Sequence, residues 1–322
     1  MTDVISTDRL TKRYDTRCVV NCLNLRVQAG GVYGLLGRNG AGKSTTIRML
    51  LGMAKPTYGR AELLGHDVAT LPPEVRGRIA YLAEGHPLYG WMTVGQAIRF
   101  IRAFHAERWN QHLLEQVLEH FELPLGKKIR RLSNGQRAHV ALALAIAPDP
   151  DLLILDDPTL GLDTVARREF LVSLIHVIQR EGRTILFSSH ILSDVERVAD
   201  RIGILVDGEL RVDCPTEHFK ETIRKVVLQF AGTPPVFPGC EGLVNVAVDG
   251  RRLELLIVDF GPAHQEIIES LSPLSCDVLD LNLEDAFIEY TRGSRPSLFA
   301  IADSAPANGV TTVHEEGRWH EG

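Results

Sequence analysis

Short apolar runs alternate with stretches of helical spacing through the first two thirds of the chain. An early run, CVVNCLNLRV at residues 18–27, is rich in β-branched residues and partly alternating, which is typical of a strand. Further runs of strand length lie at residues 32–36, 152–155, 184–188 and 202–206. Their lengths and compositions favour buried strands.

Between these runs, apolar residues recur at intervals of three and four, which predicts amphipathic helices. The helices are expected from Ser44 onward and at residues 92–108, 111–121, 135–147, 165–180 and 191–199. Pro148 and Pro150 end one helix, and Asp207 with Gly208 forms a tight turn into a further strand. Strands that alternate with helices indicate an α/β fold with a mostly parallel sheet, covered by helices on both faces.

The pattern changes after Pro215. A small α+β unit is predicted there, with strands at residues 226–230, 243–248, 253–258 and 278–281 and a helix around 263–271. Asn282 with Asp285 resembles a helix cap with its reciprocal acid, opening a last helix to Tyr290. The polar, aperiodic segment after Gly293 predicts a disordered tail. We therefore divide the chain at residues 1–214, 215–293 and 294–322.

Composition and charge narrow the class of protein. The 322 residues are 44% hydrophobic and 24% charged, with a net charge of −6, as in an ordinary globular protein. An acidic balance disfavours nucleic acid as a partner. The five cysteines form neither a disulfide framework nor a zinc site, and Cys18 and Cys22 are expected to be small buried residues in a reducing compartment.

No segment of the chain has the pattern of a membrane anchor or leader. The first ten residues, MTDVISTDRL, lack the profile of a signal peptide. The longest apolar run, at residues 140–147, is far shorter than the roughly 20 residues that span a bilayer. We expect a cytoplasmic protein that serves any membrane from outside the lipid.

The segment GRNGAGKSTT follows the run at 32–36 and opens a predicted helix. It matches the spacing G-x-x-x-x-G-K-[ST], which is typical of a phosphate-binding loop. Backbone N–H groups can surround a phosphate only where no Cβ intervenes, and the helix N-terminus adds partial positive charge. Lys43 can reach the β- and γ-phosphates, and the Ser44 hydroxyl can ligate Mg²⁺. The residues expected to bind the nucleotide here are Gly37, Arg38, Asn39, Gly40, Ala41, Gly42, Lys43, Ser44 and Thr45.

The segment LLILDDP, at residues 152–158, is an apolar strand that ends in two acids. An acid at the carboxyl end of a central strand lies beside the phosphate loop in such sheets. We expect Asp156 to hold Mg²⁺ and Asp157 to position or deprotonate an attacking water. The alternative interpretation is that one of the two acids caps the helix that follows.

The segment LSNGQ, at residues 132–136, stands before a predicted helix whose N-terminus could face an anion. We expect Ser133 to donate its hydroxyl to a phosphate oxygen and Gly135 to let backbone N–H groups approach. Asn134 stands at a position where a left-handed backbone would be tolerated by asparagine. Taken alone, the segment is equally typical of an ordinary helix cap.

Together these motifs resemble those of the ATP-binding-cassette (ABC) ATPases, whose usual signature is LSGGQ. The resemblance covers residues 4–213 in the expected order. It implies a P-loop NTPase fold of the ABC type with a helical signature subdomain. It also implies a head-to-tail dimer that holds two ATP molecules, with Ser133, Gly135 and Gln136 of each copy facing the ATP on the other.

Three further positions match the family. The resemblance implies that Tyr14 stacks on adenine, that Asp163 in TLGLD communicates across the dimer, and that His190 contacts the γ-phosphate. Tyr14 can alternatively be read as a surface aromatic residue, and a lone histidine after a strand carries little meaning outside this series.

Two positions depart from the family pattern. Asp157 replaces the usual general-base glutamate and is one methylene shorter, and a misplacement of about 1 Å can cost roughly a hundredfold in rate. Glu84 stands where a glutamine is usual. Its carboxylate could approach Mg²⁺ or the water, but it adds negative charge near the phosphates. Slow or partner-dependent hydrolysis is therefore expected.

Two regions bear on a membrane partner. The resemblance places Tyr89 and Trp91 in the part of the cleft that receives a short helix of the membrane subunit, and both could equally pack inside the helical subdomain. The closing NLEDAFIEYTRG resembles the appendage of ATPase subunits of ABC-2-type exporters, for which a regulatory or dimer-supporting role is the default.

The sequence thus predicts an ATP-hydrolysing subunit, requiring ATP and Mg²⁺, that drives a separate ABC-2-type permease, most often in export. It would form a homodimer, or a heterodimer with a related ATPase, on the inner face of the cell membrane, with no nucleic-acid partner. Two alternatives are a nucleotide-gated regulatory module with very slow hydrolysis and a soluble ABC ATPase outside transport. The single cassette, the absence of a long heptad insertion and the acidic charge disfavour the soluble class.

Overall fold

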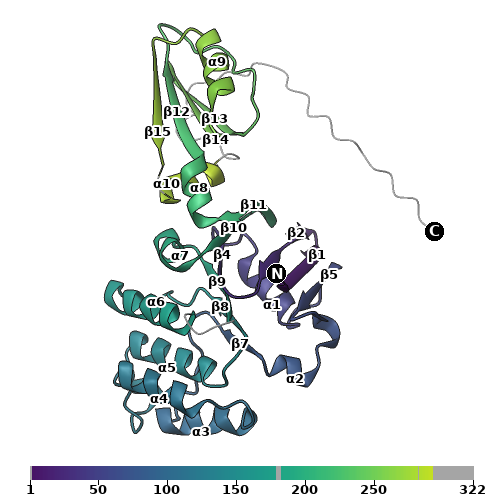
Figure 1. Ribbon diagram of the computed structural model, residues 1–322, viewed down its shortest axis with the longest axis vertical. Helices are drawn as coiled ribbons and strands as arrows, with labels where there is room; N and C mark the ends of the chain where they lie inside the picture. The colour runs from purple at the N-terminus through teal and green to yellow at the C-terminus, as the bar shows by residue number, and fades with distance from the viewer. Residues whose placement is uncertain (1, 179–182, 282, 293–322) are drawn as a thin grey trace, which may run out of the picture.

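A computed structural model describes residues 2–178, 183–281 and 283–292 (Figure 1). The expected cap at Asn282 and the tail at 294–322 lie outside these residues. Within them, no helix is both long enough and apolar enough to cross a membrane.

A six-stranded sheet lies at the centre, in the order β11-β10-β4-β9-β8-β7. Its strands are β4 (Val32–Gly37), β7 (Ile79–Leu82), β8 (Leu152–Asp156), β9 (Thr184–Ser189), β10 (Arg201–Val206) and β11 (Glu209–Pro215). All neighbours are parallel except β10 and β11, which form a hairpin. The predicted α/β fold with a mostly parallel sheet is confirmed.

The central strands are buried on both faces, so alternate residues enter two different cores. Leu35, Ile154 and Leu186 pack with helix α1 (Lys43–Leu50) on one face. Leu36 and Phe187 pack on the other face, against three helices. These are α5 (Asn134–Ile146), α6 (Thr164–Ile178) and α7 (Leu192–Val198). The apolar runs are continuous because both faces of each strand are covered.

An antiparallel sheet packs beside α1, and its first strand is not among the elements predicted from the sequence. Its strands are β1 (Asp3–Tyr14), β2 (Arg17–Leu23), β3 (Arg26–Gln28), β5 (Tyr58–Leu63) and β6 (His66–Asp67). Strand β1 carries polar residues at buried positions, which obscured its pattern. Thr7, for example, is buried because its hydroxyl donates to the Leu23 carbonyl at 2.8 Å and accepts from the Leu25 N–H at 2.7 Å. Cys18 and Cys22 are exposed, so their expected burial is wrong.

A helical subdomain is inserted between β7 and β8. It contains α3 (Val94–Phe104) and α4 (Gln111–His120), which pack with one face of α5 around a separate apolar core. Helix α3 begins two residues later than expected, because Thr93 and Gln96 form a reciprocal capping box. The short segments η1 (Val68–Thr70), α2 (Pro73–Arg76) and η2 (Ile129–Arg131) complete this half of the chain.

The C-terminal unit lies at the end of the molecule opposite the helical subdomain (Figure 1). Its antiparallel sheet has the order β13-β14-β12-β15. The elements are α8 (Thr216–Thr222), β12 (Ile223–Gln229), β13 (Leu243–Asp249), β14 (Arg252–Val258), α9 (Pro262–Ser270), β15 (Ser275–Asp280) and α10 (Leu283–Arg292). Phe219, Ile223 and Phe287 share one core with Val198 of α7, so apolar packing crosses the expected boundary after residue 214.

Candidate nucleotide site

The phosphate loop joins the buried strand β4 to helix α1. Gly40 and Gly42 adopt φ angles of 86° and 107°, which side-chain-bearing residues rarely reach. A Cβ on Gly42 would lie 2.7 Å from the Val19 carbonyl oxygen, so backbone approach from β2 also requires glycine here. No acid lies in the first turn of α1, so its N-terminal N–H groups remain suited to an external anion.

Lys43 is buried at the start of α1 and folds back over this loop. Its Nζ donates to the Gly37 carbonyl at 2.8 Å and lies 3.8 Å from Asp157 Oδ2. Burial lowers the pKa of Lys43, while the carboxylates of Asp157, Asp156 and Glu84 act in the opposite direction. The ammonium is thus placed to exchange a carbonyl partner for phosphate oxygens.

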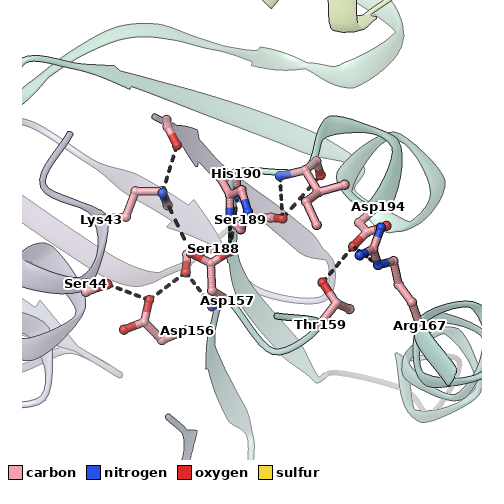
Figure 2. Close-up of polar contacts among 12 residues, drawn as sticks. Lys43, Ser44, Asp156, Asp157, Thr159, Arg167, Ser188, Ser189, His190 and Asp194 are labelled. Carbon is pink, nitrogen blue, oxygen red and sulfur yellow. Dashed lines mark hydrogen bonds and ion pairs between the residues drawn. The ribbon is translucent and has the colours of Figure 1, made fainter. Parts of the chain in front are cut away.

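Asp156 ends β8 directly beside Ser44. The Ser44 hydroxyl donates to Asp156 Oδ1 at 3.1 Å, and the Ser188 hydroxyl donates to the same oxygen at 2.8 Å (Figure 2). Ser188 also accepts from the Asp157 N–H at 3.0 Å. A carboxylate and a hydroxyl beside a phosphate loop fit Mg²⁺, which binds one or two protein oxygens together with phosphate oxygens and water. Sequence reasoning missed Ser188, whose only signal is a polar residue inside an apolar strand.

Asp157 is buried and adopts a φ of 43°, which turns its side chain toward His190. His190 Nδ1 lies 2.8 Å from Asp157 Oδ1, and the His190 N–H donates to the same oxygen at 3.2 Å. The helix after LLILDDP is capped by Asp163 instead, which accepts from the N–H groups of Val165 and Ala166. The cap interpretation of the two acids therefore receives no support from the structure.

One cavity of about 300 Å³ brings most of the expected residues together. It is lined by Val19, Asn39, Gly40, Gly42, Lys43, Ser44, Thr45, Glu84, Asp157, Leu160 and His190. Glu84 thus lies at the phosphate loop, as the sequence suggested. Val19 and Leu160 were missed, because an apolar residue in a strand or loop gives no signal of contact with a ligand.

Four loop and flanking residues take other positions. Gly37 contributes its carbonyl to Lys43, Arg38 is exposed and Ala41 is buried in the core beneath the loop. Tyr14 is exposed at the end of β1, with the Lys12 ammonium 4.8 Å from its ring centre. The Tyr14 ring is accessible to a ligand, and its role in stacking on adenine stays a prediction.

The signature residues gather at a different cavity, of about 870 Å³. Ser133, Gly135, Gln136 and Asp163 all line it, and none of them lines the phosphate cavity. Ser133 caps α5 by accepting from the Gln136 N–H at 3.1 Å. Because this bond uses an acceptor lone pair, the Ser133 O–H can still donate to an external oxygen. The cap and phosphate interpretations are therefore compatible.

Two residues of the signature have structural reasons that the sequence reasoning did not find. Asn134 lies in the first turn of α5 with a right-handed backbone, so its tolerance of left-handed angles is not used here. Its side chain instead accepts from Arg137 and donates to the Gly161 carbonyl at 3.4 Å. A Cβ on Gly135 would lie 2.8 Å from the Ala166 Cβ, so glycine permits close packing of α5 on α6.

Tyr89 and Trp91 are exposed over 59% and 64% of their surface, so they do not pack inside the helical subdomain. Tyr89 contacts Trp91 and Phe100, and Phe100 contacts Phe104, with ring centres 5.2 to 6.1 Å apart. We call these four residues the aromatic surface. Clustered exposed aromatics are typical of a protein interface.

Comparison with known proteins shows the family of this chain. The sequence model of the ABC transporter family matches residues 20–160. The bacitracin transport ATP-binding protein BcrA of Bacillus licheniformis is 39% identical, over 70% of this chain and 74% of its own length. The Nod factor export ATP-binding protein I of Burkholderia lata is 35% identical, over 87% of this chain and 94% of its own length.

Solved structures agree on the fold. A structure of the ATP-binding subunit of an ABC transporter is 28% identical, with a TM-score of 0.61 over 68% of this chain and 92% of that chain. A dimeric ATP-binding cassette with ADP and phosphate, 22% identical, superposes with a TM-score of 0.58 over 66% of this chain and 98% of that chain. The chain therefore belongs to the ABC transporter ATP-binding proteins, the ATPase subunits that drive a separate membrane permease.

Proposed function

We propose that Lys43, Ser44, Asp156, Asp157 and His190 form the hydrolytic centre. The supporting observation is their convergence: the described contacts link all five residues at the phosphate loop, with the Ser188 hydroxyl joining Asp156 to the Asp157 N–H (Figure 2). In this proposal the loop amides and Lys43 hold the β- and γ-phosphates.

Ser44 and Asp156 would hold Mg²⁺, which supplies positive charge against the phosphates when it is bound. Asp157 would orient the attacking water and accept its proton, and His190 would hold Asp157 in place and reach the γ-phosphate. Glu84 would complete the wall of the site beside the metal.

Both carboxylate oxygens of Asp157 already have neighbours. Oδ1 contacts His190, and Oδ2 lies 3.8 Å from the Lys43 ammonium. Oδ1 is occupied by the His190 backbone N–H and ring, so Oδ2 is the oxygen left to accept from a water. The shorter aspartate has less reach than the usual glutamate, which supports slow hydrolysis that depends on ATP binding or on the partner.

We further propose that two copies of this chain pair head to tail. The phosphate cavity and the signature cavity have separate linings in one chain, so a second copy is needed to bring Ser133 to the nucleotide. ATP held by both copies would favour the closed pair, and hydrolysis would reopen it. Asp163 and Gln136 would lie at the same junction.

The partner is proposed to be an ABC-2-type permease that works in export. Relatives carry names for bacitracin transport and Nod factor export, and the match to the latter covers 87% of this chain. The aromatic surface would receive the permease, which would hold the subunit at the inner face of the cell membrane. The substrate would contact the permease and not this chain.

Replacing Asp157 by asparagine tests the hydrolytic centre. We expect kcat to fall about 10²- to 10⁴-fold, because the group that accepts the proton is lost. The dissociation constant for ATP should stay within a few-fold, and MgATP should now trap a dimer that light scattering detects. ADP, or ATP with a chelator in place of Mg²⁺, should leave a monomer.

Asp249→Asn, a change of an exposed carboxylate at the end of β13, serves as the matched control and should hydrolyse ATP normally. Unchanged hydrolysis in Asp157→Asn would show that another residue handles the water. Dimers that form only with a second, related ATPase would replace the homodimer proposal with a heterodimer.

A further inference from the structure

A second buried carboxylate lies behind the Asp157–His190 pair and has no part in the chemistry above (Figure 2). Asp194 stands on α7, four residues after His190, and its side chain is 4% exposed. It also lies close enough to His190 for the histidine to influence its pKa. A buried carboxylate of this kind is costly unless its partners hold it in a defined geometry.

The partners of Asp194 come from two other segments. Thr159, fully buried and two residues after Asp157, donates its hydroxyl to Asp194 Oδ2 at 2.7 Å. Arg167 of α6 places its Nε 3.8 Å from the same oxygen. This Nε is buried and makes no hydrogen bond within the described part of the chain, so Asp194 is its charge partner at long range.

These contacts link the loop after β8 to the segment after β9. Asp157 and Thr159 belong to the first, and His190 and Asp194 to the second. The contact between Asp157 and His190 is therefore not the only one that joins these segments. Two and four residues further along them, Thr159 and Asp194 form a second hydrogen bond. Two points of attachment fix both the distance and the relative rotation of the segments, which one contact alone does not.

The energetics point to the same role. Burial raises the pKa of Asp194, while the Thr159 hydroxyl and the charges of Arg167, Arg197 and His190 act against the rise. The neighbours Leu192 and Val195 belong to an apolar core, where a hydrophobic side chain would avoid the desolvation cost. What an apolar residue cannot provide is a directional bond to Thr159.

We propose that Asp194 and Thr159 are positioning residues that hold Asp157 and His190 in register for hydrolysis, an inference that rests on the catalytic roles proposed for that pair. Arg167 extends the connection to α6, whose first turn is capped by Asp163. The relative position of Asp157 and His190 is thereby connected to the start of α6, which lines the signature cavity.

The test begins with Thr159. Thr159→Val keeps the shape of the side chain and removes the hydroxyl, and we expect kcat to fall at least tenfold while KM for ATP stays within twofold. The reason is that a shift of about 1 Å at reacting groups costs roughly a hundredfold, whereas the phosphate loop is untouched. Thr159→Ser restores the hydroxyl and should restore most of kcat.

A double variant separates positioning from simple stability. Thr159→Val alone leaves the Asp194 carboxylate buried with one partner fewer, so Tm should drop. Thr159→Val combined with Asp194→Leu removes both polar groups, so Tm should recover while kcat stays low. Recovery of kcat together with Tm would overturn the proposal, as would wild-type kcat in Thr159→Val.

Two further variants, measured alongside, separate failure of the positioning role from failure of the proposed hydrolytic centre. Ser173→Ala removes another largely buried hydroxyl, on α6, and should lower Tm without lowering kcat per bound ATP. Asp157→Asn reports on the hydrolytic centre itself. If it loses activity while the Thr159 and Asp194 variants do not, only the positioning role fails; if it keeps activity, the proposed centre and this inference fail together.

Discussion

His139 lies on α5, the helix that begins in the LSNGQ segment, and is buried in a stack of rings. Its ring lies parallel to Phe121 at 3.7 Å between centres, and Phe170 lies 6.4 Å away in a nearly parallel plane. Its Nε2 has no hydrogen-bond partner among the described residues. Burial, with a smaller contribution from the charges of His120 and His86, lowers the pKa of His139 from 6.5 to about 4.

This histidine should make folding stability sensitive to mild acid. In the unfolded chain His139 takes up a proton below pH 6.5, but in the folded chain only near pH 4, so protons favour the unfolded state between these values. Stability is unaffected by this group above pH 6.5 and falls as pH drops, by about 3 kcal/mol at pH 4. Urea unfolding of His139→Phe should show a shallower decline than the wild type by about this amount.

His112→Phe, an exposed histidine on α4, is the control and should keep the wild-type decline. Equal pH profiles for the wild type and His139→Phe would mean that the buried ring is charged or solvated in the folded chain.

At the scale of residues, the sequence predicted the site residues that lie within one motif, but not those contributed by distant segments. The residues of the phosphate loop were found because glycine, lysine and serine stand at fixed spacing within one segment. Ser188 and Leu160 also join the site, but neither residue type marks a ligand contact by itself. The Thr159–Asp194 hydrogen bond spans 35 positions, and no local pattern indicates such a partner.

Between elements, the tightest requirement lies where the signature helix meets α6. Gly135 faces Ala166, and an added Cβ would lie 2.8 Å from the alanine Cβ, closer than such atoms ever approach. The two helices must separate to admit a side chain. Ser133 caps the same end of α5. A shift of this helix end would therefore also move the Ser133 hydroxyl, which we expect to contact ATP on the other copy.

Gly135→Ala is therefore expected to destabilise the protein and weaken dimer formation with MgATP. The overpacking cost of about 1–3 kcal/mol should exceed the roughly 1 kcal/mol that alanine gains over glycine within a helix. Urea unfolding and light scattering of the Asp157→Asn background measure the two effects. Gly126→Ala, where an added Cβ meets nothing within 4 Å, is the control, and a net gain in stability for Gly135→Ala would contradict the packing argument.

Elements with strong periodicity were predicted to within a few residues, and those supported by distant partners were not. Strands β4, β8 and β9 are buried throughout, and their apolar runs are continuous because both faces are covered. Strand β1 contains buried threonines that are satisfied by backbone groups of the β2–β3 segment, so its pattern depends on neighbours. The end of α3 at Phe104 was placed four residues too late, because apolar spacing alone does not mark a helix C-terminus.

In the whole molecule, the aromatic surface lies on the helical subdomain, far from the C-terminal unit (Figure 1). Trp91 is its most exposed member after Phe104, so truncating it removes contact area without disturbing a core. If this surface receives the permease, Trp91→Ala should weaken the association by 2 kcal/mol or more, about thirtyfold, as is usual for a buried aromatic anchor.

Co-purification from detergent-solubilised membranes measures this effect, with Tm as the check on folding. Leu274→Ala, an exposed apolar residue of the C-terminal unit, should leave the association intact. The opposite result, loss with Leu274→Ala and none with Trp91→Ala, would move the docking site to the appendage.

The large-scale arrangement was predicted in outline, with one difference. The order of motifs along the chain indicated the α/β core, the inserted helices and the small terminal unit. The shared core of Phe219, Phe287 and Val198 could not be foreseen, because it forms between segments separated by about twenty to ninety positions. The two parts are therefore packed together as one body at α7, the helix that carries Asp194.

The separate linings of the phosphate and signature cavities have a genetic consequence. If copies pair as proposed, each chain contributes part of both nucleotide sites, and neither site is complete within one chain. A mutant that cannot bind nucleotide but keeps an intact Ser133 face would still pair with normal chains. The mixed dimers would have reduced activity. Such an allele would behave as dominant in a cell that also makes the normal protein, whereas an allele that fails to fold would be recessive.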